Sequence, residues 1–308
     1  MKTPLSDLTS ISQLSRKMIE NLIETARYLK ISPEPNLLSG KVIASLFFEA
    51  STRTRLSFET AVYRLGGQVI GFSDSQSTSF KQKGESLEDT IKMLDGYADL
   101  IIMRHPEVGS AKIAADTAKI PVINAGDGAN EHPTQTLTDL MSIFESQQTI
   151  DGLTIGLCGD LKYGRTIHSL VYALCLFKDI TFILFEEKGF ELPKELLDKI
   201  KNQNFIIKKA ENFESEVKNL DVLYMTRVQK ERFSHDETNK NLDLKFKIDR
   251  ALIEKYAKDN LSILHPLPRL KEINPNVDQL KQAQYFNQAK NGVFIRQALL
   301  KLMLMDKI

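Results

Sequence analysis

The sequence is poor in cysteine, the residue that builds disulfide-linked and many metal-stabilised folds. It has only two cysteines among its 308 residues, and it has no tryptophan. Cys158 and Cys175 are too few for a disulfide framework, and neither stands in a CxxC or Cys/His spacing typical of a metal site. We therefore expect two buried, reduced thiols, as is usual in a cytosolic protein, and no bound metal.

An excess of charge of one sign and long apolar runs are missing as well. The 41 Lys and Arg residues are balanced by 40 Asp and Glu residues, which excludes a strongly basic surface for nucleic acid but allows a local cluster of positive charge. No apolar run approaches the roughly 18 residues of a membrane-spanning helix. The first residues also lack the apolar segment of a secretory signal. These absences predict a soluble, cytoplasmic protein without a membrane or nucleic-acid partner.

What the sequence does contain is a regular alternation of short apolar runs with amphipathic segments. The apolar runs predict strands at Val42–Phe48, Val69–Phe72, Leu100–Met103, Val122–Ala125, Leu153–Cys158, Thr181–Phe185, Phe205–Ile207, Val222–Met225 and Ser262–Leu264. Such alternation indicates β-α units, so we predict an α/β protein with mainly parallel sheets flanked by helices. At about 150 residues per domain, the length predicts two domains.

Three longer helices are predicted from the spacing of apolar residues. The first runs from Ile11 to Leu29, the second is opened by a proline and covers Pro133–Gln147, and the third covers Tyr285–Met305. The pattern of strands restarts after the second helix, so we expect the two domains to be joined there. The spacing alone leaves open which half of the chain the last helix packs against.

The most informative segment follows the first predicted strand. Ser51, Thr52 and Thr54 alternate with Arg53 and Arg55 where a helix is expected to begin. The unpaired N–H groups and positive dipole end of a helix N-terminus, together with hydroxyl and guanidinium donors, favour a phosphate group. The alternative is a helix cap with a solvated basic face, which needs only one hydroxyl residue. A Walker-type phosphate loop is excluded because its GxxxxGK[ST] pattern does not occur.

The same segment, Phe47–Glu59 (FFEASTRTRLSFE), resembles the carbamoyl-phosphate signature of the aspartate and ornithine carbamoyltransferase family. Further segments match that family in order along essentially the whole chain: Met103–Pro106, Asn124–Gly128, His132–Leu137, Gly159–Thr166, Tyr224–Arg232 and His265–Arg269. The resemblance implies a carbamoyl-phosphate-binding domain at residues 1–133, with the helix at 285–308 packing back on it. It further implies a linking helix at 134–149 and an aspartate-binding domain at 150–284.

The resemblance also implies a set of residues for carbamoyl phosphate. In this family an α-amine attacks the carbonyl carbon of carbamoyl phosphate, and phosphate leaves. The matching positions that bind phosphate are Ser51, Thr52, Arg53 and Thr54, and those that polarise the carbonyl are Thr54, Arg104 and His132. Gln135 and the backbone carbonyls of Pro266 and Leu267 match the groups that hold the carbamoyl NH2.

For the second substrate, the resemblance favours aspartate. Arg165, Arg227 and Gln229 match the residues that bind a dicarboxylate in the family. Ornithine enzymes resemble His-Cys-Leu-Pro where this chain has His265-Pro266-Leu267-Pro268, so the cysteine that serves ornithine is missing. The alternatives are a transferase for ornithine or another amino acid, and a catalytically silent anion-binding scaffold subunit.

A polar segment from Ser73 to Glu85 implies that chains cooperate. Ser79 and Lys83 match residues that complete the site of a neighbouring subunit in the family, which would make a homotrimer the functional unit. Gln82 departs from the family, where relatives carry a second lysine. Lys83 joins Arg53, Thr54, Arg104 and His132 as the residues to which the resemblance assigns catalysis.

The remaining expectations concern partners and cofactors. Gly156, Gly159 and Gly164 do not form the GxGxxG pattern of a dinucleotide loop, and we expect no cofactor. The resemblance pairs Glu49 with Arg165 and Arg232. It implies an early step of pyrimidine synthesis, and it leaves open whether a regulatory chain binds to form a larger enzyme.

Overall fold

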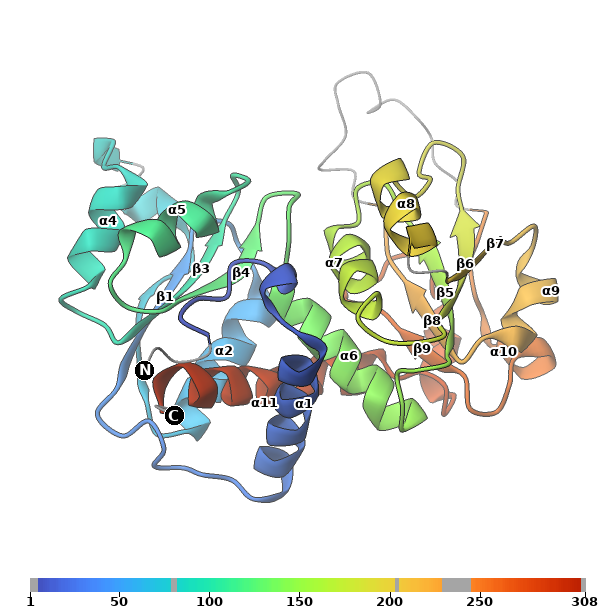
Figure 1. Ribbon diagram of the computed structural model, residues 1–308, viewed down its shortest axis with the longest axis horizontal. Helices are drawn as coiled ribbons and strands as arrows, with labels where there is room; N and C mark the ends of the chain where they lie inside the picture. Colours follow the sequence, from blue (N-terminus) through green and yellow to red (C-terminus); the bar gives the residue numbers. More distant parts are fainter. Residues whose placement is uncertain (1–4, 79–81, 203–204, 229–244, 306–308) are drawn as a thin grey trace. The chain divides into compact units, whose positions relative to one another are not determined.

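The computed structural model describes residues 5–78, 82–202, 205–228 and 245–305 (Figure 1). Contacts within the chain divide it into two compact units, Met1–Leu137 with Lys290–Ile308 (unit 1) and Thr138–Ala289 (unit 2). The divisions fall inside two long helices, α6 (Pro133–Gln147) and α11 (Tyr285–Leu304), both of which were predicted and are confirmed. The domain boundaries inferred from the resemblance, at residues 133, 149 and 284, stay a prediction.

Unit 1 is built on a four-stranded parallel sheet with the order β2-β1-β3-β4. Its strands are β1 (Val42–Phe47), β2 (Gln68–Phe72), β3 (Leu100–His105) and β4 (Val122–Asp127). Ala44 and Leu46 of β1 pack in one apolar cluster with residues of α4 (Leu87–Leu94) and α5 (Ser110–Thr117). In Figure 1, α1 (Arg16–Ile31), α2 (Thr52–Arg64) and α11 lie on the other side of the sheet. Because successive strand residues face opposite sides, a sheet covered twice needs strands that are apolar throughout.

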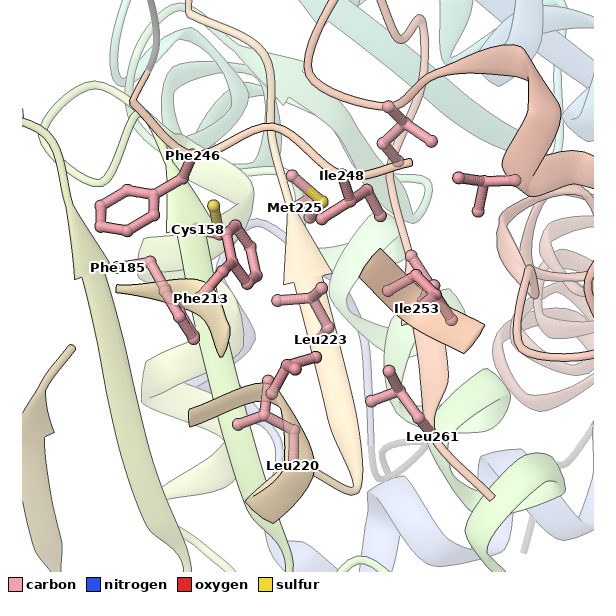
Figure 2. Packing of buried hydrophobic residues seen from close by; sticks show 14 of the residues in the cluster. Cys158, Phe185, Phe213, Leu220, Leu223, Met225, Phe246, Ile248, Ile253 and Leu261 are labelled. Atoms are coloured by element: carbon pink, nitrogen blue, oxygen red, sulfur yellow. The ribbon is translucent and has the colours of Figure 1, made fainter. Parts of the chain in front are cut away.

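Unit 2 repeats this plan with a five-stranded parallel sheet in the order β7-β6-β5-β8-β9. Its elements are β5 (Thr154–Gly159), α7 (Arg165–Leu174), β6 (Thr181–Glu186), α8 (Lys194–Asn202), β7 (Ile206–Lys209), α9 (Phe213–Glu216), β8 (Val222–Met225), α10 (Arg250–Tyr256) and β9 (Ser262–Leu264). Figure 2 shows the apolar cluster on one face of this sheet, where Phe185, Leu223 and Met225 meet Phe213 and Ile253. This cluster is the core beneath the carboxyl ends of β5, β8 and β9.

The predicted fold class, two parallel-sheet domains flanked by helices, is confirmed. The first helix differs from its prediction, because it begins at Arg16 and not at Ile11. Ser15 caps it by accepting a hydrogen bond from the N–H of Met18, and Ile11 is buried in a separate 3₁₀ turn, η1 (Ile11–Gln13). Further 3₁₀ turns are η2 (Ser75–Ser77), η3 (Val217–Asn219) and η5 (Pro275–Gln279). Apolar spacing alone therefore merged the 3₁₀ turn η1 with the helix α1, although the Ser15 cap separates the two.

Both cysteines are buried and unpaired, as expected. Burial raises the pKa of the Cys158 thiol well above its ordinary value and that of Cys175 to about 11. Neither side chain is therefore a thiolate near neutral pH, which excludes both as nucleophiles. Among the helices of the described segments, none combines the length and the apolar character that crossing a bilayer requires.

Candidate active site

In each unit, the order of the strands creates a point where the chain changes direction across the sheet. In unit 1 the chain goes from β1 outward to β2 and then returns to β3 on the other side of β1. In unit 2 it goes from β5 outward to β6 and β7 and then returns to β8. The carboxyl ends of the strands beside such a switch point are where open α/β sheets bind ligands. The predicted site residues of both units follow these strand ends.

The N-terminus of α2, directly after β1, is the expected phosphate cradle of unit 1. Ser51 is its N-cap residue, with an extended backbone (φ −155°, ψ 101°). Within the described residues, the Ser51 side chain makes no capping hydrogen bond, whereas Ser15 and Ser86 at the N-caps of α1 and α4 both do. The hydroxyl of Ser51 is thus not used by its own helix. This difference disfavours the alternative of a simple helix cap.

Thr54 and His132, which are 78 positions apart in the sequence, meet at this edge of the sheet. Both are nearly fully buried, and Thr54 Oγ1 lies 3.2 Å from His132 Nε2. Thr134 Oγ1 lies 3.4 Å from His132 Nδ1 and accepts a hydrogen bond from Arg296 Nη2 at 3.4 Å. Since Arg296 can only donate, the Thr134 hydroxyl accepts from it and can either donate to or accept from Nδ1. A hydroxyl group therefore lies beside each ring nitrogen of His132.

Arg104 lies at the carboxyl end of β3, next to the loop that follows β1. It pairs in register with Phe47, and the N–H of Phe48 donates to its carbonyl at 2.9 Å. Its guanidinium forms an ion pair with Glu49, with 2.7 Å between Nη2 and Oε2. The partners that the resemblance gave for Glu49 were Arg165 and Arg232. Arg165 belongs to unit 2, and Arg232 lies outside the described residues.

Two further predicted residues of unit 1, Gln135 and Lys83, have less specific surroundings. Gln135 is half-buried in the first turn of α6, where its N–H donates to the carbonyl of His132 at 2.9 Å. Lys83 is exposed, and Gln82 donates from Nε2 to the carbonyl of Gln76 at 3.2 Å. Ser79 lies outside the described residues. The departure at Gln82 therefore places an amide that is tied to its own loop where relatives carry a lysine.

Two of the glycines noted in the sequence, Gly159 and Gly164, lie where the backbone leaves no room for a Cβ. Gly159, at the end of β5, has φ +106°, and a Cβ there would stand 2.1 Å from the carbonyl oxygen of Thr226. A Cβ on Gly164 would stand 2.3 Å from the carbonyl oxygen of Asp160. Only glycine permits this close approach between the ends of β5 and β8. The glycines thus shape the turn that leads to Arg165.

Arg165 and Arg227 follow the two adjacent strands at the switch point of unit 2. Arg165 is the first residue of α7 and only 6% exposed. Arg227 is half-buried and donates from Nη1 to the carbonyl of Val228 at 3.1 Å. Burial lowers the pKa of His168, so its neutral ring donates from Nε2 to the carbonyl of Leu161 at 2.8 Å and braces the turn before Arg165. Gln229 lies outside the described residues.

Pro266 and Leu267 follow β9, the neighbour of β8 in the same sheet. Both are half-buried, and the backbone here departs from regular structure. Leu267 has φ +55°, and the peptide bond to Pro268 is cis. The carboxyl ends of β5, β8 and β9 therefore carry, in that order, Arg165, Arg227 and the pair of carbonyl groups named in the resemblance.

Across the described segments, no group of three or more His, Cys, Asp or Glu residues could hold a metal ion. The donors at both switch points are instead hydroxyl, imidazole and guanidinium groups, which suit anions.

Comparison with known proteins decides the family. Residues 6–145 match the family described as "Aspartate/ornithine carbamoyltransferase, carbamoyl-P binding domain", and residues 151–303 match its "Asp/Orn binding domain". The chain belongs to the aspartate/ornithine carbamoyltransferase family. The resemblance drawn from the sequence motifs is thereby confirmed.

Individual carbamoyltransferases agree over nearly the whole chain. An aspartate carbamoyltransferase catalytic subunit 2 from Shewanella halifaxensis (strain HAW-EB4) is 50% identical, over 98% of this chain and 96% of the relative. The catalytic subunit from Buchnera aphidicola subsp. Schizaphis graminum is 48% identical over the same shares. Among solved structures, the M. jannaschii aspartate transcarbamoylase catalytic subunit has a TM-score of 0.89 and 43% identity, covering 98% of this chain and 99% of its own.

A further solved relative was crystallised with two small molecules. Aspartate transcarbamoylase from Trypanosoma cruzi in complex with carbamoyl phosphate and aspartate has a TM-score of 0.90 and 38% identity, covering 98% of this chain and 97% of its own. The same carbamoyltransferase was also solved with N-(phosphonacetyl)-L-aspartic acid.

Sequence reasoning did not find every residue that shapes the site. Arg296 contacts Thr134 from α11, 162 positions away, and its guanidinium lies over the Phe58 ring with 4.7 Å between Cζ and the ring centroid. Nothing in the local pattern of α11 signals this role. Glu272 also went unnoticed, although it follows the His265–Arg269 motif closely.

Proposed function

We propose that the chain transfers the carbamoyl group of carbamoyl phosphate to the α-amine of L-aspartate, which gives N-carbamoyl-L-aspartate and phosphate. The observation that carries this proposal is the contact of Thr54 with His132 at the carboxyl edge of the sheet in unit 1. It brings the hydroxyl-rich N-terminus of α2 and an imidazole ring to one place. Family membership and the solved relative with carbamoyl phosphate and aspartate support the same reaction.

Carbamoyl phosphate binds to unit 1 in this proposal. The hydroxyls of Ser51, Thr52 and Thr54, the Arg53 guanidinium and the first N–H groups of α2 surround the phosphate. His132 donates from Nε2, and Arg104 from its guanidinium, to the carbonyl oxygen. These donors gain strength as negative charge develops on that oxygen, so they stabilise the transition state more than the bound substrate.

The reaction then proceeds by attack and departure. The amine nitrogen of aspartate forms a C–N bond to the carbonyl carbon, the C–O bond to phosphate breaks, and phosphate leaves with the electron pair of that bond. The neutral amine loses one proton in the process, and the departing phosphate takes it up. Gln135 and the carbonyls of Pro266 and Leu267 orient the carbamoyl NH2, which places the carbon for attack. Lys83 of a neighbouring chain adds positive charge to the same site.

Aspartate binds to unit 2. Arg165 and Arg227 match the two carboxylates of aspartate in charge, whereas the ammonium of ornithine would be repelled by them. Gln229 completes this set by resemblance. The curated relatives quoted above are both named for aspartate, which supports the choice between the two amino acids.

A colorimetric assay for carbamoylated amino acids tests the reaction. The purified protein is incubated with carbamoyl phosphate and either L-aspartate or L-ornithine. We expect product with aspartate alone. Product with ornithine alone would refute the substrate, and no product with either would favour the silent scaffold subunit.

We also propose that the functional unit is a homotrimer whose active sites are shared between chains through Ser79 and Lys83. A mixture of Lys83→Ala and Arg104→Ala chains, each inactive alone, tests this. After subunits exchange, one site in each mixed trimer regains both residues, so about a quarter of wild-type activity should return. Activity that stays absent after confirmed exchange would show that each site belongs to one chain.

The remaining proposals concern the setting of the enzyme. We propose that it acts in the cytoplasm in an early step of de novo pyrimidine synthesis. The family resemblance supports both points. Whether a regulatory chain joins the trimer is tested by native mass spectrometry with candidate partner chains. A mass equal to the catalytic trimer in every mixture would exclude such an assembly.

A further inference from the structure

The turn after β9 holds one residue in an unusual backbone conformation. Leu267 has φ +55°, in the left-handed region that residues with a Cβ rarely adopt. Such a conformation persists only where its surroundings enforce it, and it is most frequent at functional sites. One buried side chain, His265, is hydrogen-bonded to this residue.

The buried His265 ring is hydrogen-bonded to the backbone of this turn. It is 1% exposed, and its Nδ1 accepts a hydrogen bond from the N–H of Leu267 at 2.8 Å. Because Nδ1 accepts, the ring proton lies on Nε2, which donates to Glu272 Oε1 at 2.9 Å. Burial lowers the pKa of His265, so the ring is neutral near pH 7 and Nδ1 stays an acceptor.

The hydrogen bond to Nδ1 also sets the direction of the neighbouring carbonyl. The Pro266–Leu267 peptide is trans, since the cis bond of this segment is the following one. In a planar trans peptide, the N–H and the C=O point in opposite directions. By holding the N–H of Leu267 toward its ring, His265 therefore points the carbonyl of Pro266 away from the buried imidazole.

Glu272 holds the other end of the same turn. Its Oε1 accepts from the N–H of Leu270 at 2.9 Å as well as from His265. Burial alone would raise the pKa of this carboxyl, but the hydrogen bonds from His265 and from backbone N–H groups lower it below its ordinary value. It is thus a carboxylate at neutral pH, and as an ionised acceptor it forms strong hydrogen bonds.

The start of the turn is fixed by a second buried chain of hydrogen bonds. The N–H of His265 donates to Gln288 Oε1 at 2.8 Å, and Gln288 Nε2 donates to Asp139 Oδ1 at 2.7 Å. Asp139 also accepts from the hydroxyl of Tyr224 in β8 at 2.8 Å. The side chain of Leu267 packs against the apolar cluster of Figure 2. Each of these polar groups is buried and hydrogen-bonded, so the turn is held rigidly.

We propose that His265, oriented by Glu272, is a positioning residue that holds the carbonyls of Pro266 and Leu267 where they accept hydrogen bonds from the carbamoyl NH2. This inference rests on the proposed function, which gives these two carbonyls that role. His265 itself does not touch the substrate. It acts by presenting backbone acceptors in a fixed direction, which lowers the cost of ordering them on binding.

A pair of ligands isolates this effect. Acetyl phosphate has the phosphate and carbonyl of carbamoyl phosphate but a methyl group in place of NH2. It therefore has no hydrogen bond to the turn that a variant could weaken. We compare dissociation constants of the two ligands for the complete protein, because a change in their ratio reports the NH2 contacts alone.

Two substitutions of His265 separate its two ring nitrogens. In His265→Asn, the side-chain oxygen stands near the place of Nδ1 and accepts from Leu267. In His265→Gln, the longer side chain reaches Glu272 but offers no acceptor near Nδ1. We expect His265→Gln to weaken carbamoyl phosphate about tenfold relative to acetyl phosphate, and His265→Asn to weaken it clearly less.

His168→Gln provides the matched control. It removes another buried imidazole from unit 2, one that donates to a carbonyl in a different turn. The ratio of the two dissociation constants should stay within about twofold of wild type, as expected for a hydrogen bond made in the turn after β5 and not in the turn after β9.

The outcomes distinguish a failure of the positioning role of His265 from a failure of the proposed carbamoyl transfer. An unchanged ratio in His265→Gln, an equal loss for both ligands, or equal effects of His265→Gln and His265→Asn would each overturn the positioning role. Absence of carbamoyl-phosphate binding in the wild type would instead remove the proposed function. If His265→Gln does not fold, amide hydrogen exchange of the ligand-free wild type decides. Slow exchange at Leu267 supports the proposal, and exchange at the rate of an open loop contradicts it.

Discussion

The two units contain the same local turn, a histidine followed by proline at the end of a strand. In unit 1, His105 Nδ1 accepts from the N–H of Glu107 at 3.1 Å, and in unit 2, His265 Nδ1 accepts from the N–H of Leu267 at 2.8 Å. Both histidines are buried, and burial lowers the pKa of each. The turn is therefore a shared device for ending a buried strand.

The chemistry that the turn presents differs between the units. In unit 1 the group to which we assign a function is the Arg104 side chain, directly before the histidine, and it is a cation. In unit 2 the groups to which we assign a function are the carbonyls of Pro266 and Leu267, directly after the histidine, and they are acceptors. A substrate with a developing negative oxygen and an NH2 group needs both kinds of group. In the reaction we propose, the same local turn would thus serve two different groups of carbamoyl phosphate.

The substitution that should cost most activity is Arg104→Ala, in the turn of unit 1 that presents a cation. It removes the charged donor that we propose for the carbonyl oxygen, so kcat should fall by about 10² to 10³, or roughly 3–4 kcal/mol of transition-state stabilisation. Steady-state kinetics of the folded oligomer measure it. Turnover close to wild type would show that Arg104 does not act on the reacting carbonyl.

A second substitution tests why glycine ends β5. In Gly159→Ala the new Cβ would meet the Thr226 carbonyl oxygen at 2.1 Å, so the free energy of unfolding should drop by about 3 kcal/mol. Gly152→Ala is the control, because Gly152 also has positive φ (+76°) but open space around it. Its cost should be only about 1 kcal/mol, as expected for strain without a clash. Urea unfolding measures both, and equal losses would refute the close approach of β5 to β8.

A third substitution addresses the support of His132. Arg296→Met keeps most of the apolar side chain over Phe58 but removes the donor to Thr134. We expect kcat to fall about tenfold, because the Thr134 hydroxyl beside His132 Nδ1 loses its charged donor and holds the imidazole less firmly. The KM for aspartate, which we place in unit 2, should change little. A raised KM for aspartate with unchanged kcat would place Arg296 outside the carbonyl-activating set.

The smallest effect is a dependence of stability on pH. Burial lowers the pKa of His105, His168 and His265 in the folded chain. Unfolded histidines bind protons near pH 6.5, so below that pH the unfolded state takes up more protons and stability decreases. The loss should be at most about 1.4 kcal/mol per pH unit for each histidine. Urea midpoints at pH 7.5, 6.5 and 5.5 measure it, and His168→Gln should reduce the loss. A midpoint that does not change over this range would contradict these pKa directions.

Most of the fold could be predicted from the sequence, because strands that are buried on both faces appear in it as continuous apolar runs. Val222–Met225 and Ser262–Leu264 were predicted with the bounds that the structure has. Where polar residues extend a strand, as Arg104 and His105 do in β3, the apolar pattern ended too early. Periodicity also could not separate η1 from α1, since both bury residues at helical spacing.

Local motifs in the sequence identified the hydrogen-bond donors of the candidate site, but not the residues that orient these donors. The segment Ser51–Thr54 was informative because strand end, hydroxyls and arginine coincide within a few residues. The Arg296–Thr134 contact and the Glu49–Arg104 ion pair depend on how distant segments pack, and no pattern in the chain encodes that. His265 and Glu272 are only seven positions apart, yet their link exists only because the turn between them folds back.

We propose that each unit binds one of the two substrates, and a single binding measurement can decide this. The ligand is N-(phosphonacetyl)-L-aspartic acid, which joins a phosphonate to aspartate and with which a relative was solved. Calorimetry compares the wild type with Arg53→Ala in unit 1 and Arg227→Ala in unit 2. We expect both variants to fold and each to lose at least about tenfold in affinity. Undiminished affinity in either folded variant would refute the division of the substrates between the two units.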